Sequence, residues 1–357
     1  DRVAEVLGKR YYDPVFRTEE LPKLIERYRA RAHAAETPAA ERRVIFELLG
    51  QCPTSHLTLI SEYGGRYAQN ELSGRTAPTL GFQLARVADR GLFVQRVIYG
   101  GPAHREGLLR GDRLLTIDGV APEQSPRLDW RSDDAHLPDT PKHVVRADAP
   151  VRLRLERRRG EPFELTIAPS PWSALKADRA SMRVMDRAGL RLGYLHLSYM
   201  YDRDASGLLV EAMSGPLRDC DGLVLDLRGR GGSPRAVSRV TRALCAADPV
   251  YGGPLVLLID RDTRSAKEAL AWELRKRQRA TLVGEKTAGA VRPGRFVAIG
   301  EGAVLFLPVP SNYAYTRELE LKGVEPDVEV ADPLPFAAGS DPILEAGLRA
   351  LLTLIPV

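Results

Sequence analysis

The hydrophobic and polar positions at the start of the chain follow a helical repeat. Apolar residues recur at intervals of three and four, as in Leu21, Leu24, Ile25 and Tyr28. Such spacing places apolar side chains on one face of a helix. The pattern predicts helices up to about residue 62, in an N-terminal helical domain of residues 1–70. The polar, glycine-containing stretch over 64–78 is typical of a linker.

The pattern changes to short alternating segments over residues 78–170. An apolar strand at 92–97 is followed by a Gly-Gly-Pro turn and a short helix, and a second strand ends at Asp118-Gly119. An Asp-Gly pair between alternating apolar residues is a hairpin signal. The basic run 152–159 alternates with leucine, which predicts the solvent face of a hairpin strand. These features predict a small β-rich domain.

The last part of the chain, residues 171–357, alternates strand and helix patterns. Apolar runs predict strands at 190–197, 222–227, 255–259, 280–283 and 304–309. Helical repeats predict helices at 206–217, 234–247 and 266–279. This alternation favours a sheet covered by helices. The expected fold is therefore an α/β multidomain protein, with an N-terminal helical segment, a β-rich module and an α/β core.

Composition excludes several classes of function. The net charge is +5 over 357 residues, but acidic and basic residues are interspersed, so no nucleic-acid partner is expected. No apolar run approaches the roughly 20 residues of a membrane span. The three cysteines form no CxxC pair, and His104, His136 and His143 lack metal-ligand spacing. We expect no metal and no other cofactor.

Two motifs of the last domain carry candidate chemistry. Ser265 stands between the apolar run 254–259 and the helical run that begins at Ala266. A serine there is either an N-cap or an exposed nucleophile at the positive end of a helix dipole. The glycine-rich turn 228–233 follows a strand and leaves backbone amides open to a bound group. It lacks the Gly-Lys-Ser/Thr ending of a phosphate loop.

The β-rich module resembles a PDZ domain. The resemblance rests on Leu80-Gly81-Phe82, on the Gly-Pro-Ala turn after the first strand and on the strand closed by Asp118-Gly119. It implies that the amides of Leu80, Gly81 and Phe82 bind a peptide C-terminal carboxylate while the peptide adds a strand. A long insertion, residues 124–148, departs from the family pattern. It is expected either to form a flap or to hinder the groove, and a purely structural PDZ lid is the alternative.

The order of motifs along the chain resembles the superfamily of C-terminal processing peptidases and tricorn proteases. A Ser55-His56 loop, a PDZ domain, an Asp-Leu-Arg turn at 226–232, a Ser-Ala-x-Glu helix at 265–268 and Gly-Val-x-Pro-Asp at 323–327 follow one another. The resemblance implies a crotonase-like layered core and a serine endopeptidase that works through an acyl-enzyme. Its substrates would be unfolded polypeptides, recognised in part through their C-termini.

The resemblance also assigns roles to individual residues. Ser265 maps to the nucleophile, and the amides of Gly231 or Gly232 and of Ala266 map to the oxyanion hole. The Ser-Lys branch carries a lysine at the position of Ala290, so an aligned Ser-Lys dyad is excluded. The tricorn-like Ser-His-Glu branch instead assigns the general base to His56 and the orienting acid to Glu320.

Several residues keep alternative interpretations. Ser55 could add a polar link to the proposed set of Ser265, His56 and Glu320. Glu318 takes the place of Glu320 if the alignment with the family motif is shifted by two residues. Glu268 is expected to cap the helix start with Ser265. Lys267 should diverge from Ser265 by roughly 200° around the helix, which favours a surface salt bridge or substrate steering over a direct base role. His196 alternates with leucines and is expected within a sheet.

Two broader questions also stay open. A catalytically inactive member of the superfamily, acting as a peptide or apolar-ligand binding protein, is the alternative function. The resemblance and the start without methionine lead us to expect a periplasmic or secreted protein, with a cytoplasmic location as the alternative.

Overall fold

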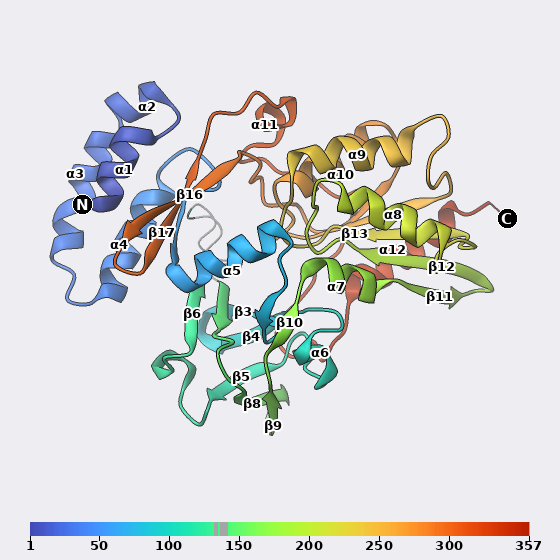
Figure 1. Ribbon diagram of the computed structural model, residues 1–357, viewed down its shortest axis with the longest axis horizontal. Coiled ribbons are helices and arrows are strands. Elements are labelled where there is room, and N and C mark those ends of the chain that lie inside the picture. The colour runs from blue at the N-terminus through green and yellow to red at the C-terminus, as the bar shows by residue number, and fades with distance from the viewer. Residues whose placement is uncertain (132–134, 136–141, 357) are drawn as a thin grey trace.

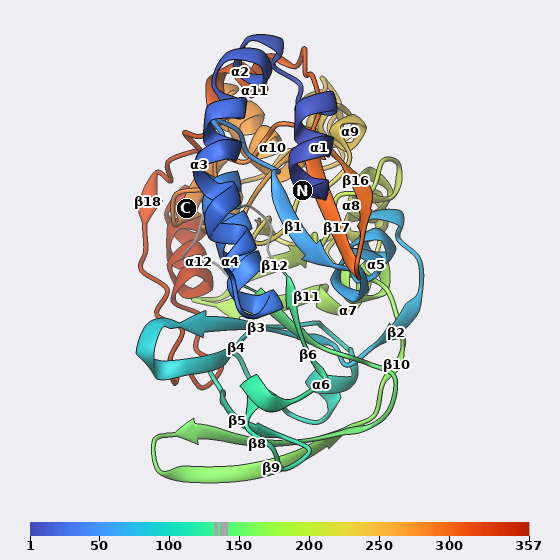
Figure 2. The ribbon, with the colours of Figure 1, turned by 90° about the vertical axis from the view of Figure 1, so that its left-hand side faces the viewer.

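The computed structural model describes residues 1–131, 135 and 142–356, and it arranges them in three parts (Figure 1). N-terminal helices lie beside a small sheet, a β-rich module lies below them, and a helix-covered sheet forms the remainder (Figures 1 and 2). The predicted fold class is confirmed: the protein is a mixed α/β multidomain chain.

The N-terminal part combines segments from early and late in the chain. Its helices are α1 (Arg2–Arg10), α2 (Pro14–Glu19), α3 (Leu21–His33) and α4 (Pro38–Gly50). Strand β1 (Thr58–Ser61) pairs antiparallel with β17 (Ala303–Pro308), which pairs with β16 (Gly294–Gly300). Leu7, Leu49 and Leu57 are buried with Leu305 and Leu307 in one apolar core. The N-terminal helices therefore pack against strands that follow the PDZ-like module and most of the core in sequence.

The predicted linker over 64–78 is wrong in its first part, which belongs to α5 (Glu62–Ser73). The Ser61 side chain caps this helix by accepting from the Gly64 amide at 2.9 Å. A Cβ on Gly65 would come within 3.3 Å of Val304, so the glycines serve close packing of α5 rather than flexibility. Gly74 ends the helix in the left-handed conformation, at φ 66°.

The β-rich module is one antiparallel sheet with the strand order β6-β7-β3-β4-β5-β8-β9. Its strands are β3 (Phe82–Val87), β4 (Gly91–Val97), β5 (Arg113–Ile117), β6 (Leu128–Arg131), β7 (Lys142–Val145), β8 (Val151–Arg158) and β9 (Glu161–Ile167), and its short helices are η1 (Ala88–Arg90), α6 (Pro102–Arg105) and η2 (Pro122–Gln124). Asp118 and Gly119 both have positive φ, as the predicted hairpin turn requires. Arg152 and Arg154 are exposed and alternate with the buried Val151, Leu153 and Leu155, which confirms the predicted solvent face.

Two antiparallel strands join this module to the rest of the chain. Strand β2 (Ala77–Thr79) leads into the module, and β10 (Ser170–Trp172) leads out of it and pairs with β2. The entering and leaving chain segments therefore lie side by side.

The α/β core is built on a sheet with the order β11-β12-β13-β14-β15-β18, in which all neighbours except β11 and β12 are parallel. The strands are β11 (Arg183–Arg187), β12 (Leu190–His196), β13 (Gly222–Asp226), β14 (Leu255–Ile259), β15 (Thr281–Gly284) and β18 (Val328–Glu329). The helices are α7 (Ala174–Ser181), α8 (Asp204–Ser214), α9 (Pro234–Cys245), α10 (Ala266–Lys276), α11 (Ala314–Leu319) and α12 (Pro342–Leu354).

Alternate side chains of each strand pack on opposite faces of this sheet. Leu223, Leu225 and Leu257 lie in the cluster formed with α8, α9 and α10. Val224 and Val256 lie in the cluster formed with α12. Both faces are thus covered, as parallel sheets require. No helix among the described residues is long and apolar enough to cross a membrane.

Candidate active site

Ser265 stands at the start of α10, where the chain turns from β14 into the helix. Its backbone has φ 59° and ψ −126°, a conformation that costs a non-glycine residue about 1–3 kcal/mol. All residues from Asp262 to Ala271 are buried except Ser265, which is partly exposed. The strained turn thus presents the hydroxyl of Ser265 at the surface of an otherwise buried segment.

The carboxylate of Glu268 holds this turn in place. Its oxygens accept from the amide of Ser265 at 3.1 Å, the Thr287 hydroxyl at 2.6 Å, and the amides of Gly289 and Ala290 at 2.7 and 2.9 Å. Burial raises the pKa of Glu268 to about 7, against the effect of these donors. The predicted cap at the helix start is therefore also a clamp on the distant 287–290 turn.

The glycine turn after β13 lies directly against Ser265. A Cβ on Gly231 would come within 2.7 Å of the Ser265 Cβ atom, so a side chain there would displace one of the two. The Gly231 carbonyl accepts from the Met200 amide at 3.1 Å, and the backbone of Gly232 packs on Met200. The predicted oxyanion residues Gly231 and Ala266 therefore both adjoin Ser265, and Gly232 is the next residue of the turn.

Charged side chains fix the start of this turn. Arg228 binds Asp341 through two hydrogen bonds of 2.7 and 2.8 Å, and it also binds Asp226. The Asp260 carboxylate accepts from the amide of Gly229 at 3.0 Å and from the Thr263 hydroxyl at 2.9 Å. The turn and the segment that precedes Ser265 are thus tied to each other.

Glu320 lies at the end of α11 and binds the Ser55 loop. Its carboxylate accepts from the Ser55 amide at 2.8 Å and from the Ser55 hydroxyl at 3.0 Å. It also accepts from the amides of Arg292 at 2.9 Å and Val291 at 3.3 Å. Glu318 is exposed on α11. Of the two predicted acids, Glu320 is the one that contacts the Ser55-His56 loop.

His56 follows Ser55 in the loop between α4 and β1. Its backbone has φ 56°, only 8% of the residue is exposed, and its ring lies 5.4 Å from that of Phe306, centroid to centroid. The Ser55-His56 loop and Ser265 are both held by one short segment. Ala290 accepts from the amide of Ser265 at 2.8 Å, and the next two residues donate to Glu320.

The surroundings of Ala290 and Lys286 decide whether a lysine at either position could act as the general base for Ser265. Ala290 is buried beside Ser265 and offers only a methyl group at the position where the Ser-Lys branch carries its amine. Lys286 is exposed and pairs with Glu325 at 2.6 Å.

The prediction of a surface role for Lys267 is wrong, because this residue is fully buried. Its Nζ donates to the carbonyl of Arg228 at 3.0 Å and to that of Ser198 at 3.2 Å. Burial lowers the pKa of Lys267 to about 7, and burial raises that of the neighbouring Asp178 to about 7. No signal in the sequence distinguishes Lys267 from an exposed lysine, because its burial comes from the elements packed around α10.

Other histidines of the sequence belong to separate elements where the structure describes them. His196 ends β12, as expected, and its buried ring faces the Arg228 carbonyl at 3.3 Å. His104 lies on α6 and His143 on β7, whereas His136 lies outside the described residues. No group of three potential metal-ligating side chains occurs within the described part of the chain.

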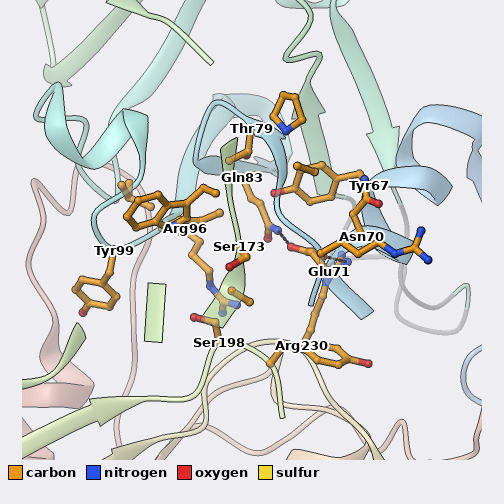
Figure 3. A pocket seen from close by; sticks show the side chains of 18 of the residues that line it. Tyr67, Asn70, Glu71, Thr79, Gln83, Arg96, Tyr99, Ser173, Ser198 and Arg230 are labelled. Atoms are coloured by element: carbon orange, nitrogen blue, oxygen red, sulfur yellow. Dashed lines mark hydrogen bonds and ion pairs between the residues drawn. The ribbon is translucent and has the colours of Figure 1, made fainter. Parts of the chain in front are cut away.

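A pocket opens between the β-rich module, α5 and the core (Figure 3). Gln83 and Arg96 line it from the module, Glu71 from α5, and Ser198 and Arg230 from the core. Gln83 donates to Glu71 at 3.4 Å, and Arg230 pairs with the same carboxylate at 3.4 Å. Because Arg230 precedes Gly231, the pocket borders the glycine turn beside Ser265.

Comparisons with known proteins agree with this architecture. Residues 238–330 match peptidase family S41, and residues 71–129 match the PDZ domain. A carboxyl-terminal-processing protease from Synechocystis is 27% identical, over 92% of this chain and 79% of that protein. A tricorn protease homologue from Streptomyces coelicolor is 25% identical, over 99% of this chain, which spans only 32% of that longer protein.

Solved structures share the fold. The photosystem II D1 C-terminal processing protease superposes with a TM-score of 0.52 at 21% identity, covering 95% of this chain and 96% of that one. Tricorn protease gives a TM-score of 0.50 at 17% identity, over 98% of this chain and 36% of that one. The chain is thus similar to peptidase family S41 over residues 238–330 and to the PDZ domain over residues 71–129. Its similarity extends to both C-terminal processing proteases and tricorn homologues.

Proposed function

We propose that this protein is a serine peptidase of the tricorn-like Ser-His-Glu type, which hydrolyses unfolded proteins or peptides through an acyl-enzyme. Ser265 is the nucleophile, His56 the general base and Glu320 the acid that orients the base. Ser55 links Glu320 to the histidine loop. The amides of Gly231 or Gly232 and of Ala266 form the oxyanion hole.

The reaction follows from these roles. His56 removes the hydroxyl proton as the Ser265 oxygen attacks the peptide carbonyl carbon, and backbone amides stabilise the resulting oxyanion. The C–N bond then breaks while His56 returns the proton to the leaving amine. Water, deprotonated by the same histidine, releases the acyl group and restores Ser265.

One observation carries the proposal: the Ser265 turn and the Ser55–Glu320 contact meet on the segment 290–292. Ser265 donates to Ala290, and Glu320 accepts from the following two amides. A histidine next to Ser55 suits the base role because its ordinary pKa lies near neutrality. Ala290 supplies no amine to take that role.

Polypeptide substrates fit the pocket between the module and the core (Figure 3). Thr79 and Gln83, which line it, stand on either side of the Leu80-Gly81-Phe82 loop, and Arg230 adjoins the glycine turn. A chain whose C-terminus lies at that loop could extend along the pocket toward Ser265. PDZ recognition of C-termini is therefore part of the proposal. A periplasmic or secreted location is a further part, to be tested by cell fractionation.

A fluorophosphonate probe, followed by peptide mapping, tests the site. We expect labelling of Ser265 in the wild type, none in Ser265→Ala, and at least a hundredfold slower labelling in His56→Ala. Glu320→Gln should label slowly, whereas Lys267→Met should still label because the amine points to the Arg228 and Ser198 carbonyls.

Hydrolysis of unfolded casein by the same variants provides the second readout. If Lys267→Met lost labelling while His56→Ala kept it, and circular dichroism showed both variants folded, the general base would be Lys267 and the assignment to His56 would be wrong. A folded wild type that neither labels nor hydrolyses would favour the alternative, an inactive member that binds peptides or apolar ligands.

A further inference from the structure

The insertion of the PDZ module adds two strands to the module's own sheet. In its described part, β7 pairs antiparallel with β3, with His143 opposite Leu84 and Lys142 opposite Ala85. Strand β6 then pairs with the far side of β7. The edge of β3 is therefore covered by the chain itself.

That edge is where a PDZ domain receives its ligand. Strand β3 begins at Phe82, the last residue of the predicted carboxylate loop, and its other side pairs with β4. A strand has two sides for backbone pairing, so an incoming peptide strand and β7 need the same N–H and C=O groups of β3. They cannot both be bound along these residues.

Side chains of the insertion also cover the apolar surface beside the loop. Val145 and Ala147 are buried in the same cluster as Leu80, Phe82 and Leu84. The amide of Gly81, one of the predicted carboxylate donors, donates instead to the Thr79 hydroxyl at 3.0 Å. The groove is thus occupied by backbone and by side chains of the same chain.

The insertion also contacts the N-terminal part. The Trp130 ring of β6 packs edge-on against Phe46 at 5.9 Å between centroids. The amide of Ala135, between β6 and β7 in sequence, donates to the carbonyl of Leu57 at 3.1 Å, and Leu57 follows His56. The insertion that covers β3 thus also binds the residue next to the candidate base.

We propose that β7 is a built-in competitor of peptide C-termini for the edge of β3, and that its pairing with β6 couples this edge to the segment carrying His56. The kind of ligand is an extended peptide with a free carboxylate and an apolar last residue, since the covered surface is apolar. The competition between β7 and the peptide is argued from strand pairing alone. The coupling of this edge to His56 rests on the proposed function.

Under competition the apparent affinity equals the intrinsic affinity multiplied by the fraction of molecules in which the edge is free. The probe is a fluorescein-labelled, unstructured peptide with an apolar C-terminal residue, and its C-terminal amide is the control, both read by fluorescence polarisation. The locked variant is Ala85→Cys/Lys142→Cys, because directly opposite residues of antiparallel strands lie within reach of a disulfide. Its reduced form and each single cysteine variant are matched controls.

The released variant is Lys142→Pro/His143→Pro. Successive amides of a strand point to opposite sides, so one of these two prolines removes a donor that faces β3. We expect no binding to the oxidised locked protein, recovery on reduction, and about tenfold tighter binding to the released variant than to the wild type. The amide peptide should bind none of them.

Equal affinity for the oxidised, reduced and released proteins would overturn the competition, as would no binding even after release. Fluorophosphonate labelling of Ser265 is measured on every variant. Labelling that is accelerated by the free-acid peptide in the wild type and not in the locked form supports the coupling, and labelling indifferent to peptide overturns it. If no variant labels, the peptidase proposal fails while polarisation still decides the competition.

Discussion

At the scale of single residues, the site depends on buried polar groups that bind backbone atoms. Glu268 accepts from the amides of Ser265, Gly289 and Ala290, and Lys267 donates to two carbonyls. Sequence patterns singled out Ser265 and Glu320 as candidates because the motifs of the resembling family mark their positions, and their catalytic roles stay predictions. The same patterns did not reveal Lys267 as buried, since a lysine is normally exposed and only the packing of α10 shows otherwise.

His196 predicts how stability depends on pH. Burial lowers its pKa to about 3, so between the ordinary value of 6.5 and that value the unfolded chain binds a proton that the folded chain does not. Stability contributed by the neutral ring is therefore present above pH 6.5 and is lost as the pH falls. The free energy of unfolding of the wild type, measured with urea, should fall between about pH 7.5 and about pH 5. For His196→Asn it should fall less.

His33→Asn, which removes an exposed histidine on α3, is the control for loss of a histidine as such. Identical pH dependence in the wild type and in His196→Asn would show that the buried ring does not govern this effect.

At the scale of elements, the turn after β13 and the start of α10 are paired parts of one site. Both leave the carboxyl ends of neighbouring parallel strands, which follows from the order β13-β14. The alternating strands and helices predicted the central strands of this sheet with closely matching bounds, because apolar runs mark parallel strands directly. The edge strands β11 and β18 and the short α11 were not predicted, since charged residues interrupt any apolar run in β11 and the other two contain only a few residues.

Gly231→Ala tests the contact between these two elements. The new Cβ would meet Ser265 at 2.7 Å, and a displacement of about 1 Å at a reacting group lowers kcat/KM about a hundredfold. Gly207→Ala is the matched control, because Gly207 is exposed within α8 and a Cβ there contacts nothing within 4 Å.

We expect the Gly207 variant to keep its activity and to gain about 0.5–1 kcal/mol in unfolding free energy. Unchanged fluorophosphonate labelling in Gly231→Ala would mean that the turn does not position groups for attack. Urea unfolding of both variants separates catalytic from structural loss.

At the scale of the whole molecule, the PDZ module is held to the core by a clasp of residues 332–340. Arg110 of the module pairs with Asp332 at 2.8 Å, and the amide of Phe336 donates to Gly111 at 3.0 Å. The rings of Phe93 and Phe336 meet edge-on at 5.4 Å. No sequence pattern predicted this contact, because it joins irregular segments that lie far apart in the sequence.

Arg110→Met should loosen the clasp. The Asp332 carboxylate, 11% exposed and with its pKa already raised to about 6 by burial, would lose its cation. We expect a loss of roughly 1–3 kcal/mol in unfolding free energy and faster hydrogen exchange over residues 332–340. Arg158→Met, which removes an exposed arginine, should change stability by less than about 0.5 kcal/mol.

A double variant, Arg110→Met with Asp332→Asn, completes the cycle. It should lose less than the sum of the single losses if the two side chains interact directly. Additive losses would assign the effect of Arg110 to its packing and to its hydrogen bonds with the carbonyls of Asp332, Pro333 and Ser340.

Strand β1 has a consequence for the order of events during synthesis. It precedes the PDZ module in sequence, yet its partner β17 leaves the ribosome only after the module and most of the core have been made. The Ser55-His56 loop likewise finds Glu320 only when that glutamate has emerged. Pairings over such separations form late in folding. A nascent chain that already contains the Ser265 turn therefore lacks Glu320, and the proposed site stays incomplete until most of the polypeptide has been made.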